Sequence, residues 1–332
     1  MTPRSRRGFG LVSTAERRQA DRFLADLLGI RSQWIAEAES GENWIPTPSF
    51  PPRTSSMTGT AFMATIAGDK APGRPGPWQK REDAMVAELL AGNIPAWLKQ
   101  WITVRVSKKD ASPVVTVRVL PDYLCVGTDT DYRHLPLDQQ SAQKVASAFG
   151  AILPTAKICH AIWRWTPWSH VISAIQLPTL RKKANKDFAQ NSTAAYDASS
   201  LAIQEEMKSK GISPGELVAG HKKDVVLSAR ARASPEKISF HGFYLGKYPA
   251  EPCYEGGDPA SCNPELPVVT HPEGQGHFSD YSQGVRLVHP QMNIDGALHL
   301  VADVLKDMKL CTLIAEGPID PPRVPPPPPP KG

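Results

Sequence analysis

Proline restricts the fold of this chain more than any other residue does. The 332 residues include 33 prolines, about twice the usual share of roughly 5%. A proline inside a helix removes a backbone hydrogen bond and clashes with the preceding turn, so this abundance argues against an all-helical bundle. Hydrophobic residues make up 41% of the chain, which is enough for a real core. No apolar run approaches the roughly 18 residues of a membrane span, and we expect a soluble protein.

Strand and helix patterns both occur between residues 58 and 315. Val104 and Val106 alternate with polar residues, and after a polar turn Val115 and Val117 do the same, which is typical of a β-hairpin. Further strands are predicted at 123–127, 225–227, 237–244, 268–270 and 285–288. Helices are predicted at 81–91, after Asp138, after Pro154-Thr155, at 197–210 and from Asp295 onward. We therefore predict an α+β protein with a single mixed core of short, mostly antiparallel strands, flanking helices and disordered tails.

These patterns predict three parts of the chain. Residues 1–57 form an N-terminal amphipathic arm and linker, because apolar residues recur at helical spacing between Phe23 and Ile30. Residues 58–315 form the α+β core domain. Residues 316–332 form a proline-rich tail that is expected to adopt polyproline II and to stay outside the core. Such a tail is a candidate for binding a protein partner.

The compartment stays open at the level of sequence. Arg6-Arg7 resembles the start of a twin-arginine export signal, but charged residues follow where such a signal needs an apolar stretch. No intact signal peptide is therefore predicted. Cys253 and Cys262 bracket a loop rich in turn formers, and a disulfide between them would suit an extracytoplasmic protein. The other cysteines lie among apolar residues and are expected to be buried; they are Cys125, Cys159 and Cys311.

The net charge of +5 does not by itself indicate a protein that binds nucleic acid. A nucleic-acid-binding domain concentrates its basic residues on one face. Here many of them lie in the N-terminal arm and in one short run between Arg181 and Lys186. A solvated linker or helix face explains that run, so nucleic acid is not expected as a partner.

Titratable residues gather in two segments, each beside an apolar strand. His221 and Asp224 belong to the first segment, and His277 and Asp280 belong to the second. Residues three apart point to opposite faces of a strand, so either pair converges only in a turn. A glycine precedes each histidine and suits such a turn. An aspartate beside an imidazole raises its basicity, which suits a general base.

The same segments allow a divalent metal ion, the one cofactor that we consider. Imidazoles and a carboxylate can hold such an ion and leave a position open for water. The candidate ligands are His221, His271, His277 and Asp280. Their spacing matches no named metal motif.

Further candidates follow from the second segment and its neighbours. Ser282 is a candidate nucleophile, although its surroundings lack the first glycine of a GxSxG motif. Lys223, Tyr281 and Arg286 are candidates for binding substrate. Arg286 stands within an apolar strand, where it faces an internal acid or an anionic ligand, or else lies on the polar side of an edge strand. Tryptophans cluster between Trp163 and Trp168, either as core residues or as an aromatic platform for a ligand.

Several blocks resemble a family of uncharacterised bacterial proteins, several of them exported. The blocks include GNIP at 92–95, PDYL at 121–124, AGHKKDVV at 219–226 and DYSxGVRLV at 280–288. The resemblance covers roughly residues 58–290 and implies that the N-terminal arm and the proline tail are additions. It implies no particular activity. The family often has a histidine where this chain has Gln283, which would make this chain an inactive copy if that histidine is catalytic.

The functional interpretation is a hydrolase that acts on a peptide, cell-wall or glycan-type substrate. His221, Asp224, His277 and Asp280 would form its acid-base or metal-assisted centre. The alternative is a noncatalytic binding or assembly protein that uses the tryptophan cluster, the basic arm and the proline tail. The two differ in one structural requirement, because only an enzyme needs His221 and the segment 277–286 to lie close together.

Overall fold

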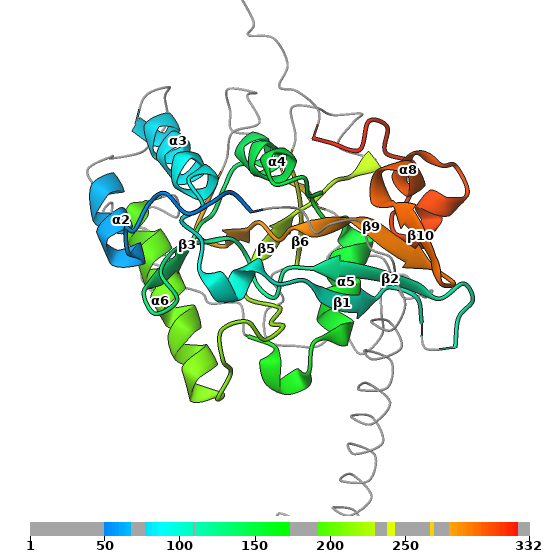
Figure 1. The fold of residues 1–332 in the computed structure, drawn as a ribbon, viewed down its shortest axis with the longest axis horizontal. Helices are drawn as coiled ribbons and strands as arrows, with labels where there is room; N and C mark the ends of the chain where they lie inside the picture. The colour runs from blue at the N-terminus through cyan, green and yellow to red at the C-terminus, as the bar shows by residue number, and fades with distance from the viewer. Residues whose placement is uncertain are drawn as a thin grey trace, which may run out of the picture. The chain divides into compact units, whose positions relative to one another are not determined.

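The computed structural model describes residues 50–67, 77–108, 110–172, 192–229, 238–242, 266–268 and 279–324. Within these ranges the chain has the α+β fold predicted from its sequence, with short, mostly antiparallel strands and flanking helices (Figure 1). No helix among these residues combines the length and the apolar character needed to cross a membrane. Several predictions lie outside the described residues: the helical arm, the part of the proline tail after residue 324, the Cys253–Cys262 disulfide, His271 and His277. The described part of the predicted tail, residues 316–324, does not stay outside the core, because Ile319 and Val324 are buried in it.

The predicted hairpin is confirmed as part of a four-stranded sheet. β1 (Ile102–Arg105) pairs antiparallel with β2 (Val115–Val119). β2 also pairs with β9 (Val288–Ile294), which pairs with β10 (Ala297–Leu300), so that the order is β1-β2-β9-β10. In β2 buried valines alternate with half-buried polar residues. This period of two is what a strand with one face on the core requires.

A second sheet brings the two titratable segments side by side. β5 (Lys223–Val225) pairs antiparallel with β6 (Ile238–Gly242) and parallel with the short β8 (Gln283–Gly284). β7 (Leu266–Val268) completes the order β7-β6-β5-β8. Lys223 is the register partner of Gln283. The described parts of the two segments are therefore neighbours, as an active site built from both would require.

A small hairpin and a group of helices lie at one end of the sheets. β3 (Cys125–Gly127) pairs antiparallel with β4 (Tyr132–His134), a strand that the sequence patterns did not predict. Around this hairpin pack α2 (Gly59–Ile66), α3 (Pro77–Leu90) and α6 (Thr193–Ser209) (Figure 1). Thr58 and Ser192 cap α2 and α6, because each side-chain oxygen accepts a hydrogen bond from a backbone N–H of the first turn.

Two of the remaining helices begin directly after an N-cap residue. Asp138 caps α4 (Gln139–Ala148) as predicted, and Thr155 caps α5 (Ala156–Trp165). α5 packs between β1 and β6, and α8 (Val301–Lys306) packs against β9 and β10. Three short 3₁₀ turns complete the described elements: η1 (Ala96–Lys99), η2 (Trp168–His170) and η4 (Leu310–Leu313).

One large apolar cluster joins the sheets to the helices. It includes Leu89 of α3, Val117 of β2, Ile158 of α5 and Leu287 before β9, each fully buried. Burial of a side chain of this size contributes about 1.5–3 kcal/mol. The cysteines at 125, 159 and 311 are free and buried, as predicted.

The tryptophans after residue 162 belong to the core where the structure describes them. Trp163 is buried, and Trp165 is partly buried and packs on the apolar cluster. Core packing is therefore confirmed for these two residues. The Trp168 side chain lies outside the described part of the chain.

The predicted helix from Asp295 onward is wrong in its first third. Asp295 has φ of +50° and Gly296 of +86°, and the two residues form the turn between β9 and β10. Asp-Gly is the typical sequence of a two-residue hairpin turn. Leu298 therefore lies in a strand, and the helix begins only at Val301. The spacing of the apolar residues is compatible with a helix and with a strand at 297–300, and the Asp-Gly turn favours the strand.

Candidate metal centre

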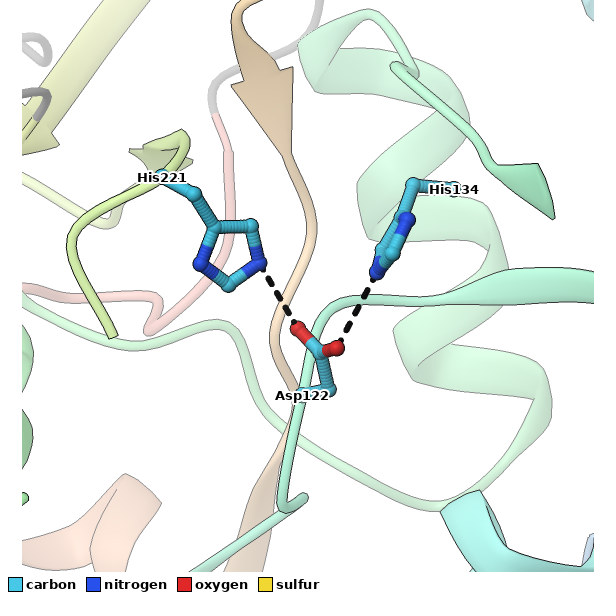
Figure 2. A group of neighbouring side chains, drawn as sticks. All are labelled: Asp122, His134 and His221. Carbon is cyan, nitrogen blue, oxygen red and sulfur yellow. Dashed lines mark hydrogen bonds and ion pairs between the residues drawn. The ribbon is translucent and has the colours of Figure 1, made fainter. Parts of the chain in front are cut away.

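One carboxylate lies between two imidazoles in the interior of the protein. Nε2 of His134 is 3.0 Å from Oδ2 of Asp122, and Nε2 of His221 is 3.0 Å from Oδ1 of the same residue. Figure 2 shows the two rings approaching the carboxylate from different segments of the chain. All three residues are only 1% exposed. A buried carboxylate is costly unless it is paired or hydrogen-bonded, and here both of its oxygens have partners.

Three separate segments supply these residues. Asp122 lies in the turn after β2, and that turn is held by the bond from Leu124 N–H to the Val285 carbonyl. His134 ends β4, where its register partner is Cys125. His221 follows Gly220, whose φ is +101° and whose hypothetical Cβ would lie 2.6 Å from the Ile172 carbonyl oxygen. Only glycine fits this turn, and the turn directs His221 towards Asp122.

The hydrogen bonds define the protonation of His134. An ionised carboxylate can only accept, so Nε2–H of His134 donates to Asp122. Nδ1 of His134 then accepts from the Ser200 hydroxyl at 3.1 Å, while Ser200 Oγ accepts from the His134 backbone N–H at 2.9 Å. With a metal ion on Nε2 the ring proton would instead be on Nδ1 and would be donated to Ser200 Oγ, the kind of second contact that is typical of histidines that bind metals. Nδ1 of His221 is buried and has no hydrogen-bond partner within the described structure.

The electrostatics favour an ionised Asp122 and a neutral His221. Burial raises the pKa of Asp122, but the His134 and His221 rings lower it more, so that the pKa lies well below its ordinary value. The Tyr123 backbone N–H also donates to Oδ1, at 2.7 Å. Burial lowers the pKa of His221 more than Asp122 raises it. A neutral imidazole and an ionised carboxylate are the forms that bind a metal.

Tyr123 links this centre to Asp224. Its ring packs edge-on against His221 with centroids 4.9 Å apart, and its hydroxyl donates to Oδ2 of Asp224 at 3.0 Å. Burial raises the pKa of Asp224 to about 6. Asp224 therefore contacts Tyr123, whereas His221 contacts Asp122. The predicted His221/Asp224 convergence is thus replaced by two adjacent contacts joined through one tyrosine.

Lys222 and Arg286 are two buried cations beside the centre. Lys222 donates to Ser199 Oγ at 3.1 Å and to the Tyr281 carbonyl, and burial lowers its pKa to about 8. Arg286 lies over the Tyr123 ring at 4.5 Å from its centroid. Its guanidinium donates to three backbone carbonyls at 2.7–2.9 Å, those of Leu120, Pro121 and Val218.

Arg286 lies close enough to the internal acid Asp224 to oppose the rise of its pKa, which agrees with one of the two predicted alternatives. Its side chain is 1% exposed, and its hydrogen bonds tie the turn that carries Asp122 to the segment before His221. These bonds and its packing on the Tyr123 ring indicate that its role is to hold the centre in place.

Asp280 organises a second polar group with Ser282 and Lys223. Oδ1 of Asp280 accepts from the Ser282 backbone N–H at 2.7 Å and from the Ser282 hydroxyl, and Nζ of Lys223 lies 3.3 Å from Oδ2. The structure thus pairs Ser282 with a carboxylate. A hydroxyl that donates to a carboxylate is not aligned with a histidine base. The Tyr281 side chain is buried, and its carbonyl accepts from Lys222.

Gln283 is a buried amide with unsatisfied atoms. Its side chain is 0% exposed, and neither its oxygen nor its nitrogen has a hydrogen-bond partner in the part of the chain that the structure describes. Leaving such atoms unbonded is unfavourable. Gln283 is therefore an unfavourable residue at this buried position in the described structure.

Asp122 and His134 were missed by the sequence reasoning. Asp122 stands in the PDYL block, but it was not considered as a ligand because no histidine lies near it in the chain. His134 was set aside because no partner pattern surrounds it. The signal that could have joined them is the turn at 128–131, which allows a β3-β4 hairpin and so brings residue 134 back towards residue 122.

The cluster has the composition of a transition-metal site. One ligand atom from each of Asp122, His134 and His221 can be chosen so that all three lie within 4.8 Å of one another. Two imidazoles and a carboxylate are a common ligand set for zinc and for non-haem iron. Three protein ligands leave a coordination position for water or substrate.

Comparison of the chain with protein-family models, with curated proteins and with solved structures finds no match.

Proposed function

We propose that Asp122, His134 and His221 bind one divalent transition-metal ion, zinc being the best fit, and that the protein is a metal-dependent hydrolase. The observation that carries the proposal is the convergence of the three ligand atoms within 4.8 Å. A metal ion lowers the pKa of a bound water from about 15.7 to about 7 and so supplies hydroxide near neutral pH. Such a hydroxide can attack a peptide, cell-wall or glycan-type substrate.

Neighbouring residues supply the remaining chemistry. Asp224, with a pKa of about 6, can take up a proton near neutral pH, which suits a general base. Lys222, with a pKa of about 8, can give one up. Tyr123 connects the metal ligands to Asp224 through its ring and hydroxyl. These three residues are therefore the proton-transfer candidates, and Arg286 is a positioning residue.

The direct test is metal content. The full chain, purified without chelators, is loaded with Zn²⁺ or Co²⁺, desalted and analysed by plasma mass spectrometry. We expect one ion per chain, and for Co²⁺ the visible absorption of a site with nitrogen and oxygen ligands. His221→Gln and Asp122→Asn should each lower metal affinity by at least about tenfold, which is the scale of loss even for residues that only support the ligands.

A matched control separates ligation from general effects. His299→Gln removes an imidazole from β10, outside the centre, and should leave the metal content unchanged. Circular dichroism of each variant shows whether it has folded. If folded wild-type protein retains no metal, the cluster is a metal-free hydrogen-bond network, and the noncatalytic binding protein becomes the better interpretation.

A further inference from the structure

A basic cleft lies away from the candidate metal centre. It has a volume of about 240 Å³ and lies between the loop that follows β1, helix α5 and the turn η4. Three cations line it: Lys108 from the loop, and Lys157 and Arg164 from α5. The described residues of its wall include no acidic side chain. The cleft thus concentrates positive charge on a concave surface, where the field of the charges is strongest.

The two cations of α5, Lys157 and Arg164, are held at the cleft by burial and by hydrogen bonds to backbone carbonyls. Lys157 is half-buried, and burial, with the nearby Arg164, lowers its pKa despite the opposing influence of Glu316. Its ammonium has three donors, and one of them is given to the Thr312 carbonyl. Arg164 donates to the Val106 carbonyl at 2.9 Å, which fixes the guanidinium at the cleft. Arg164 is near enough to Lys157 to contribute to its lowered pKa, and both side chains line the same cleft.

The other residues that line the cleft are mainly apolar, and they indicate the chemistry of the uncharged part of a ligand. Val106, Val115, Pro113 and Leu313 contribute apolar surface, and the buried His160 also lines the cleft. The volume is several times the roughly 30 Å³ that a water molecule occupies in the liquid. An anion alone would leave much of this space unfilled, so the ligand needs an apolar body beside its charged group.

We propose that this cleft binds a small phosphate monoester with an apolar body. A phosphate group carries about 1.5–2 negative charges at neutral pH and offers three acceptor oxygens, which matches three cationic side chains better than a single carboxylate does. The apolar walls take the rest of the molecule. The site is independent of the metal centre and of the proposed hydrolase.

Isothermal titration calorimetry of the full chain at low ionic strength tests this proposal. The probes are phenyl phosphate, inorganic phosphate and benzoate, with sodium chloride as the ionic-strength control. We expect saturable binding of phenyl phosphate at one site, weaker binding of inorganic phosphate because it lacks the apolar body, and weaker binding of benzoate because it has one charge. Absence of saturable phenyl phosphate binding, or tighter binding of benzoate, would overturn the proposal.

Variants locate the binding site. Arg164→Gln and Lys157→Gln should each weaken phenyl phosphate binding by at least about tenfold, because a charge-assisted hydrogen bond is worth that much. Lys144→Gln removes an exposed charge from α4 and should leave the affinity unchanged. Ala111→Trp fills the cleft without removing a charge and should abolish binding even if the α5 variants fold poorly. Wild-type affinity in folded Arg164→Gln or Ala111→Trp protein would show that phosphate binds elsewhere.

Discussion

Replacing Arg286 by methionine tests how the centre is held in place. The arginine is 1% exposed and donates three hydrogen bonds to the carbonyls of Leu120, Pro121 and Val218. A buried carbonyl left without a partner costs about 1–3 kcal/mol. The Pro121 carbonyl also accepts from the Val218 backbone N–H, so the loss falls on the other two, which together would cost roughly 2–6 kcal/mol. Methionine retains part of the packing on the Tyr123 ring. We therefore expect a net loss of about 3–5 kcal/mol, the range found when a buried charge network loses one partner.

The assay is unfolding in urea followed by circular dichroism, with a thermal melt beside it. For a domain of this size a loss of 4 kcal/mol corresponds to a fall of roughly 10 °C in the melting temperature. Arg323→Met is the matched control, because Arg323 is exposed and should change stability by no more than about 0.5 kcal/mol. A loss below about 1 kcal/mol for Arg286→Met would refute the reasoning, since the Leu120 and Val218 carbonyls would then have found other partners.

Three further predictions concern single positions. The pKa of Asp224 in the folded protein, about 6, lies above its unfolded value, so its protonated form stabilises the fold below about pH 4 and this contribution is lost as the pH rises through 6. The unfolding free energy of the wild type should therefore fall by about 3 kcal/mol between pH 4 and pH 7 because of this group, and Asp224→Asn should remove that fall. Urea titrations at the two pH values measure this, and an unchanged pH dependence in the variant would contradict it. Gln283→Leu removes two unsatisfied buried atoms and should raise the unfolding free energy by about 1–2 kcal/mol; a loss of stability would mean that the amide is bonded in solution. Gly220→Ala should lower the unfolding free energy by about 2 kcal/mol or more in the same assay, because the new Cβ would meet a carbonyl oxygen at a positive φ. Gly296→Ala is the control, since Gly296 also has a positive φ but has open space around it, and it should lower the unfolding free energy less. Equal losses for the two variants would exclude the steric explanation.

Some elements were predictable because their cause is local. The β1-β2 hairpin follows from alternating valines, and α4 follows from the Asp138 cap and the apolar spacing after it. A cap or an alternation acts between residues a few positions apart, so the sequence displays the whole interaction. The helix predicted from Asp295 is wrong because apolar spacing alone does not distinguish a helix from a strand there, whereas the local Asp-Gly sequence indicates a hairpin turn.

The candidate site was only half predictable. The sequence showed that 219–226 and 280–288 carry titratable residues at strand ends, and β5 and β8 do lie side by side. It could not show that His221 bonds to Asp122, a residue 99 positions earlier, or that Arg286 reaches three carbonyls in two separate segments, residues 120–121 and residue 218. Such contacts depend on how the sheets and loops pack, and residue type alone does not encode the partner.

The sequence by itself therefore determined the α+β class, the positions of most helices and strands, and one segment that contributes to the centre. Local propensity, caps and periodicity were sufficient for this, since they act over a single element. Only the tertiary structure decided that Asp122 lies between His134 and His221, because two turns and the end of β4 must meet in the interior for that carboxylate to be paired. Burial then determines the chemistry, because removal of water shifts the pKa values and makes each partner of a charged group essential.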